Sequence, residues 1–193
     1  MLKRRVLRML AAVGLAAAMA CAADLPRPAP DFTLTFPNAK PIQLSQYRGK
    51  VIVLAFILTT CPHCQKTVGF LSTLQNEYGP RGLQVLACAI DDMAAMLVPD
   101  FVTRFHPPFP VGLAPRDPVL SFLQHPTMYR MYMPQVAFID RDFVIRAQHA
   151  GDDPFFTNEE QQEKNLRDQI EALLKEGAPA AKKHGSPKAK KAS

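Results

Sequence analysis

Four consecutive residues, Cys61-Pro62-His63-Cys64, carry the most reactive side chains of this sequence. Two cysteines separated by two residues can close a small disulfide ring or bind a metal ion. A zinc site needs four ligands, and the remaining cysteines, Cys21 and Cys88, belong to no paired motif. The spacing favours redox chemistry, with metal binding and an inert disulfide as the alternatives, and we expect no cofactor.

The flanking pattern places this motif where a strand ends and a helix begins. Residues 51–58 form a continuous apolar run rich in β-branched residues, which predicts a buried central strand. Residues 62–78 have helical spacing, and Gly79-Pro80 stops the helix. Cys61 would then meet the free N–H groups and positive end of a helix, which stabilise a thiolate.

The other three residues of the motif complete the predicted reaction centre. Pro62 suits the first helical turn, where its missing N–H costs nothing. His63 adds polar stabilisation to the thiolate, more so when it is protonated. Cys64 lies one turn into the helix, is more buried, and is placed to attack a mixed disulfide formed by Cys61. A Cys61–Cys64 disulfide is the predicted oxidised form.

A second element of the predicted site is Met133-Pro134, directly before a strand over residues 135–140. A proline at a strand entry cannot join the hydrogen-bond ladder and can be cis. We expect Pro134 to pack beside the two cysteines, and the backbone of Met133 to pair with a client peptide. Thr60, directly before Cys61, is expected to contact the same client; an ordinary loop proline is the alternative.

The remaining elements form an α/β pattern. We expect a strand over residues 83–90, a helix from Asp92 as its N-cap to about Phe105, and a short helix at 118–123. A hairpin over 136–148 follows, and a last helix over 157–176 with Thr157 as N-cap, Glu160 as its capping partner and Gly177 as its end. This order predicts a mixed central sheet with helices on both faces.

The ends of the chain differ from its middle in composition. The net charge of +6 comes from basic residues in 1–20 and 178–193, so residues 21–177 carry −3, which argues against a nucleic-acid partner. Residues 1–20 read as an export signal with a charged start, a short apolar run and Ala18-Met19-Ala20. Residues 21–30 read as a linker, 31–177 as the domain, and 178–193 as a disordered basic tail. Cys21 is a candidate lipidation site and hence a membrane tether.

The motifs taken together resemble the TlpA/ResA-like thioredoxin family within the wider redoxin (AhpC/TSA, peroxiredoxin-like) superfamily. The resemblance rests on residues 29–34, on residues 42–50, on the apolar run with its CxxC, and on residues 109–111 and 133–140. It implies a thioredoxin fold with an N-terminal β extension and a central insertion. It also implies an exported or membrane-tethered thiol–disulfide oxidoreductase, with cysteine-containing client proteins and a membrane-bound or soluble thiol redox partner.

Three positions depart from that family's pattern. Thr60 replaces the usual Trp before the first cysteine, Thr67 replaces an acid three residues after the second, and Ala55 stands where thioredoxin has a buried acid. The proton-handling carboxylate is therefore missing from both expected places. We accordingly expect no negative charge near the pair, and a centre more oxidising than thioredoxin.

Two rival functions use the same residues. A peroxiredoxin would have Thr three residues before the reactive cysteine and Pro seven before it, where this chain has Leu58 and Leu54. Copper delivery would use thiolates and thioethers, which suit Cu(I). Its candidate ligands besides the CxxC precede Pro134: His125, Met128, Met131 and Met133. We expect these residues instead to provide packing and an apolar client groove, and Cys88 to act as a small buried hydrophobe.

Overall fold

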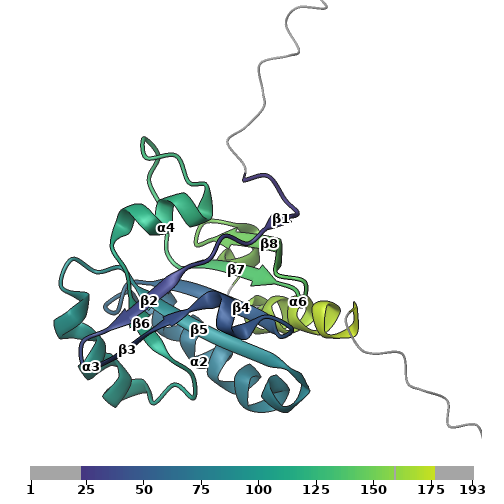
Figure 1. Cartoon of the computed structure of the whole chain (residues 1–193), viewed down its shortest axis with the longest axis horizontal. Coiled ribbons are helices and arrows are strands. Elements are labelled where there is room, and N and C mark those ends of the chain that lie inside the picture. The colour runs from purple at the N-terminus through teal and green to yellow at the C-terminus, as the bar shows by residue number, and fades with distance from the viewer. Residues whose placement is uncertain (1–22, 159, 177–193) are drawn as a thin grey trace, which may run out of the picture.

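The computed structural model describes residues 23–158 and 160–176, and its centre is one eight-stranded sheet with the strand order β1-β8-β7-β4-β5-β6-β2-β3 (Figure 1). The strands are β1 Arg27–Pro28, β2 Thr33–Phe36, β3 Ala39–Gln43, β4 Val51–Ile57, β5 Leu83–Ala89, β6 Val111–Leu113, β7 Gln135–Ile139 and β8 Val144–Ala150. The helices are α2 Pro62–Tyr78, α3 Ala94–Phe105, α4 Arg116–Leu123, α5 Pro154–Thr157 and α6 Gln162–Glu176, with 3-10 turns η1 Leu44–Tyr47 and η2 Gly79–Arg81.

The sheet is mixed, as the sequence predicted. Strand β4 runs parallel to β5, and β5 runs parallel to β6. On its other side β4 pairs antiparallel with β7, which forms a hairpin with β8. The N-terminal extension, formed by β2 and β3, joins the sheet where β2 pairs with β6. Along the chain, the segment between β5 and β7 contains α3, β6 and α4. This arrangement confirms the thioredoxin-like fold.

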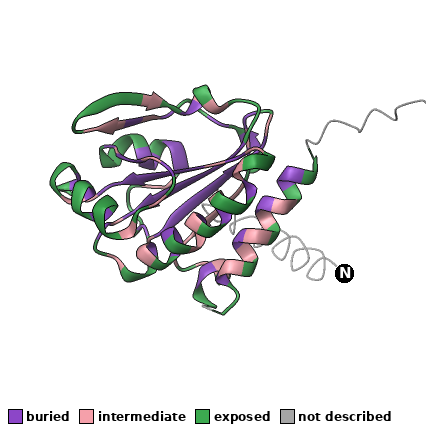
Figure 2. Ribbon diagram, turned by 90° about the horizontal axis from the view of Figure 1, so that it is seen from below, coloured by how far each residue is buried: buried purple, intermediate pink, exposed green. Residues whose placement is uncertain are grey.

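Strand β4 divides the protein into two hydrophobic cores, because its side chains alternate between the sheet's faces. All of its residues are buried, and Figure 2 shows the central strands as the buried interior of the molecule. Val51, Val53, Ala55 and Ile57 pack with α2, α3 and α6 on one face. The intervening residues pack on the other face with α4 and with Phe32 and Leu34 of the N-terminal extension. The helices therefore cover both faces.

Two predicted helix starts are wrong. Helix α3 begins at Ala94 after Met93, and no side chain caps it, so Asp92 is not its N-cap. The predicted helix over residues 157–176 is two helices: Asp153 caps the short α5 by accepting from the Phe155 N–H at 2.8 Å, and Thr157 is its last residue. Helix α6 starts at Gln162, and its predicted stop at Gly177 lies outside the described residues.

The predicted linker over residues 21–30 is partly structured. Arg27 and Pro28 pair with Ile145 and Val144 of β8, so this segment forms an outermost strand of the sheet. The Arg27 side chain is buried and donates to the carbonyl of Phe122 at 2.6 Å. Composition could not reveal this strand, because the contacts that hold it come from distant residues. Residues 1–20, Cys21 and 178–193 lie outside the described part of the chain.

Candidate functional site

Cys61 lies at the junction between β4 and α2. It is the N-cap residue of α2 with extended backbone (φ −78°, ψ 120°), and Pro62 occupies the first helical turn. The Cys61 carbonyl accepts the N–H of Gln65 at 3.0 Å, and its own N–H donates to the carbonyl of Leu58 at 3.1 Å. No acidic residue lies in the first turn of α2, so nothing there offsets the positive helix end beside the half-buried Cys61.

Cys64 differs from Cys61 in burial, although the two residues belong to the same hydrophobic core. Its side chain is fully buried, whereas Cys61 is partly exposed, and both residues are free thiols. Burial raises the pKa of Cys64 far above its ordinary value; the nearby Cys61 and Asp91 raise it further, and the Leu58 backbone acts the other way. Cys64 therefore holds its proton more tightly than an ordinary thiol, and Cys61 is the more accessible of the two sulfurs.

Asp91 is the functional residue that sequence reasoning missed. It follows β5, whose end lies beside that of β4, and its carboxylate accepts the Thr59 N–H at 3.0 Å and the Thr59 hydroxyl at 3.0 Å. It also opposes ionisation of Cys64. The expectation of no negative charge near the pair is therefore wrong: Ala55 and Thr67 carry none, but the neighbouring parallel strand supplies one.

Thr67, which stands where the family often has an acid, takes part in two hydrogen bonds between uncharged groups. It is fully buried, its hydroxyl donates to the carbonyl of His63 at 2.9 Å, and it accepts from the buried amide of Gln162 at 2.7 Å. These hydrogen bonds tie the first turn of α2 to the start of α6. A glutamate here would have to displace Gln162 and place a charge in the core, which is costly.

Pro134 and His63 line one cavity of about 210 Å³, together with residues of the β8–α6 region. The Met133–Pro134 peptide bond is cis, and Pro134 is buried. Gly151 also lines this cavity, and its N–H donates to the carbonyl of Tyr132 at 3.2 Å. A Cβ on Gly151 would lie 2.3 Å from the Met133 carbonyl oxygen, so the chain passes close to this peptide only because residue 151 has no side chain.

The remaining predicted residues fall in different places. Thr60 is exposed and lines a pocket beside Cys61, while Met133 packs against both cores. Met131 belongs to the core on the sheet face opposite Cys64, and Met128 is 83% exposed, which argues against a copper site shared with the CxxC. Cys88 is buried on that opposite face, as expected for a small hydrophobe.

No large ionisable cluster accompanies the pair. Across residues 23–158 and 160–176, no group of three or more His, Cys, Asp or Glu side chains is arranged to hold a metal ion.

In the same ranges, no helix is both long and apolar enough to cross a bilayer. What the site brings together is a half-buried thiol and a buried thiol, and next to them His63 lines a cavity with Pro134.

Comparisons with known proteins identify the family of this chain and relatives that carry out thiol–disulfide chemistry. The model of the redoxin family matches residues 26–169. The thiol-disulfide oxidoreductase ResA of Geobacillus kaustophilus is 33% identical over 93 residues, which cover 48% of this chain and 53% of that protein. ResA of Bacillus thuringiensis is 29% identical over 90 residues, covering 47% and 51%. This chain thus spans about half the length of these curated relatives in the aligned region.

Solved structures extend the likeness over most of the chain. A Chlorobium tepidum protein, provisionally assigned as the thiol:disulfide interchange protein DsbE, superposes with a TM-score of 0.66 at 25% identity, covering 79% of this chain and 99% of the other. A provisionally assigned protein disulfide isomerase of Bacteroides thetaiotaomicron gives a TM-score of 0.64 at 26% identity, covering 80% and 92%.

Proposed function

Because this chain belongs to the redoxin family, we propose that it is a thiol–disulfide oxidoreductase that exchanges disulfides with cysteine-containing client proteins through Cys61 and Cys64. The observation that carries the proposal is the asymmetry of the pair: one thiol is accessible at a helix start, and the other is fully buried in contact with it. An inert structural disulfide has no need of this division, whereas a two-step exchange depends on it.

In the reducing direction, the Cys61 thiolate attacks a client disulfide. A Cys61–client disulfide forms, and the displaced client sulfur leaves as a thiolate that takes up a proton. Cys64 then loses its proton and attacks Cys61, so the Cys61–Cys64 disulfide forms and the second client thiol is released. Two electrons pass from the protein to the client, and the reverse sequence oxidises a client dithiol.

The neighbouring residues have separate roles in this scheme. Pro62 starts the helix that stabilises the Cys61 thiolate, and His63 adds polar stabilisation at the exposed end. Pro134 closes the side of the site next to His63, and the Met133 backbone pairs with the client. Thr60 contacts the client on the other side of Cys61.

We further propose that the protein works outside the cytoplasm, with a thiol redox partner that is either membrane-bound or soluble. The support is the charged start, apolar run and Ala18-Met19-Ala20 of residues 1–20. Cys21 would tether the protein to the membrane if it is lipidated. Mass spectrometry of the protein from its native cell tests this: we expect residues 1–20 to be absent, and an intact Met1 in cytosolic extract would contradict export.

The exchange reaction is tested with three cysteine variants in an insulin-reduction assay. Cys61→Ser should abolish exchange, and Cys64→Ser should accumulate mixed disulfides with the substrate. Cys88→Ala is the matched control, because Cys88 is buried on the opposite face of the sheet and should leave exchange intact. Equal activity of the wild-type protein and Cys61→Ser would refute the proposed function.

A further inference from the structure

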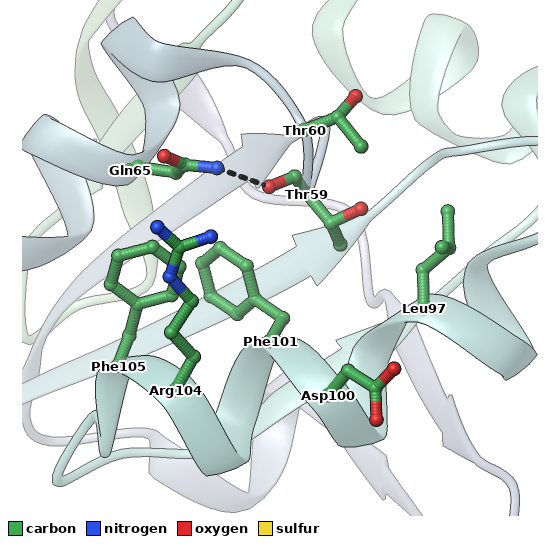
Figure 3. Close-up of a pocket in the computed structure, with 8 residues that line it drawn as sticks. All are labelled: Thr59, Thr60, Gln65, Leu97, Asp100, Phe101, Arg104 and Phe105. Atoms are coloured by element: carbon green, nitrogen blue, oxygen red, sulfur yellow. Dashed lines mark hydrogen bonds between the residues drawn. The ribbon is translucent and has the colours of Figure 1, made fainter.

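A pocket of about 320 Å³ is lined by residues on both sides of Cys61 in the sequence, and it shares no lining residue with the cavity at Pro134. Figure 3 shows its lining residues. One wall comes from Thr59 and Thr60, which precede Cys61, and from Gln65 in the first turns of α2. The other wall is a face of α3. A client joined to Cys61 by a disulfide therefore has this pocket next to its reactive cysteine.

The floor of the pocket is aromatic. The rings of Phe101 and Phe105 lie 4.7 Å apart between centroids and meet at 41°. Phe101 is buried and Phe105 is half-buried, and both pack with the core that includes Cys64. Small concave sites with an apolar floor and few polar groups bind apolar side chains. The floor therefore suits one apolar residue of a client.

Arg104 supplies the charge that faces the pocket. Its guanidinium lies 5.2 Å from the centre of the Phe105 ring, and Figure 3 shows it between the aromatic rings and Gln65. Arg104 is exposed and forms no ion pair within the described part of the chain. Asp100, one turn earlier, points away from this guanidinium in Figure 3.

On the opposite wall, Thr59 and Gln65 are already hydrogen-bonded within the protein. The Gln65 amide donates to the Thr59 carbonyl at 2.9 Å, while the Thr59 N–H and hydroxyl are bound by Asp91. The negative charge of Asp91 is thus already engaged by two donors. Arg104 is the positive charge that the pocket lining offers to a ligand, Asp100 is its acidic residue, and a guanidinium pairs best with a carboxylate.

We propose that this pocket recognises the client segment next to its reactive cysteine, holding an apolar side chain on Phe101 and Phe105 and pairing a client carboxylate with Arg104. The inference rests on the proposed function, because a client reaches the pocket only while Cys61 attacks it. It gives the substrate class: segments that carry an apolar residue and an acidic residue next to the reactive cysteine.

The test uses three peptides that differ in one residue. Each has a cysteine held as a disulfide with a coloured aromatic thiol, then Phe, then Glu, Gln or Lys, and each is also made in the reverse order. The Cys61 thiolate attacks the peptide sulfur and releases the aromatic thiolate, and Cys64 then releases the peptide thiol. The electrons come from the protein's own dithiol, so the reduced protein is mixed with each peptide and the colour is followed.

We expect the wild-type protein to react with the Glu peptide about fivefold faster than with the Lys peptide in at least one order, the ratio for an exposed charge pair of about 1 kcal/mol. Arg104→Gln should remove this preference, and Arg104→Glu should reverse it. Arg116→Gln makes the same charge change at the start of α4, which packs on the other face of the sheet, and should keep the preference.

The outcomes separate failure of the proposed function from failure of the pocket inference. If the wild-type protein releases no thiol from any peptide, the proposed function fails. If all peptides react at equal rates in the wild-type protein and in Arg104→Glu, exchange stands and the pocket inference is overturned. Loss of the preference in Arg116→Gln as well would assign it to overall charge and would also overturn the inference.

Discussion

The carboxylate of Asp91 holds the backbone N–H and the hydroxyl of Thr59, and so joins the end of β5 to the loop that carries Cys61. Through this link a single acidic side chain both shapes the loop before the exposed cysteine and opposes ionisation of the buried one. Its two effects can be separated, because an amide keeps an acceptor oxygen but has no charge.

Asp91→Asn should move the pH dependence of the second exchange step to lower pH. Removing the charge removes one of the causes that raise the pKa of Cys64, while the amide oxygen still accepts from Thr59. The measurement is the rate at which Cys64 releases a preformed Cys61 mixed disulfide, followed from about pH 6 to 10. Asp92→Asn, an exposed neighbour, is the control. Identical profiles for Asp91→Asn and the wild-type protein would contradict the role of Asp91.

Thr67→Val should destabilise the protein by about 1–3 kcal/mol, the cost of leaving a buried polar group without its partner. Valine has a similar shape, but it removes the acceptor of the Gln162 amide. Urea unfolding gives the free energy. In a Gln162→Leu background the same change should cost markedly less, because no amide is left unpaired. Equal costs in the two backgrounds would show that the hydrogen bond contributes nothing measurable.

Gly151→Ala should destabilise the protein by roughly 1–3 kcal/mol, as overpacking does, and should slow client exchange. The added methyl would overlap the Met133 carbonyl and push it from its place beside Pro134. Gly69→Ala is the matched control: this glycine is exposed on α2 with no atom within 4 Å of the new methyl, so it should stabilise the protein by about 0.5–1 kcal/mol. A Gly151→Ala protein with wild-type stability and exchange rate would rule out the close contact.

The reduced protein should lose stability as pH rises above about 8.5, the ordinary pKa of a thiol. Burial raises the pKa of both Cys64 and Cys88, so above this pH the unfolded chain releases protons that the folded protein retains. The slope is then negative, up to about 1.4 kcal/mol per pH unit for each thiol. Urea unfolding with reductant between about pH 8 and 9.5 measures it. Cys88→Ala should make the slope shallower, and an unchanged slope would contradict this assignment.

The strand and helix that carry the redox pair could be predicted from the sequence. Strand β4 ends at Ile57, one residue earlier than the predicted strand over 51–58. Helix α2 has the predicted bounds. Both are set by local signals: a buried β-branched run, Pro62 at the helix start and Gly79-Pro80 at its end. The peptide bond before Pro134, which the sequence left open as cis or trans, is cis.

One missed element depends on distant residues, and two others had local signals that were not used. Strand β1 is held by two residue pairs with β8, which no local pattern announces. Helix α5 begins at Pro154, because Asp153 is its N-cap residue. Asp153 followed by Pro154 is a stronger helix-start signal than Thr157, the predicted N-cap. Asp91 did have a signal in the sequence: it lies just past the end of β5, two residues after Ala89, and β5 runs parallel to β4, so both strands end at the same edge of the sheet.

The outermost strands of the sheet, β1 and β3, each contain a proline, Pro28 and Pro41, and β3 also exposes Lys40. Proline has no N–H to offer a further strand, and an exposed lysine discourages edge-to-edge association. Both borders of the sheet therefore resist being lengthened by a foreign chain. Under the proposed function, client proteins would bring unfolded segments to this surface, and borders that resist pairing would keep those segments from adding to the sheet.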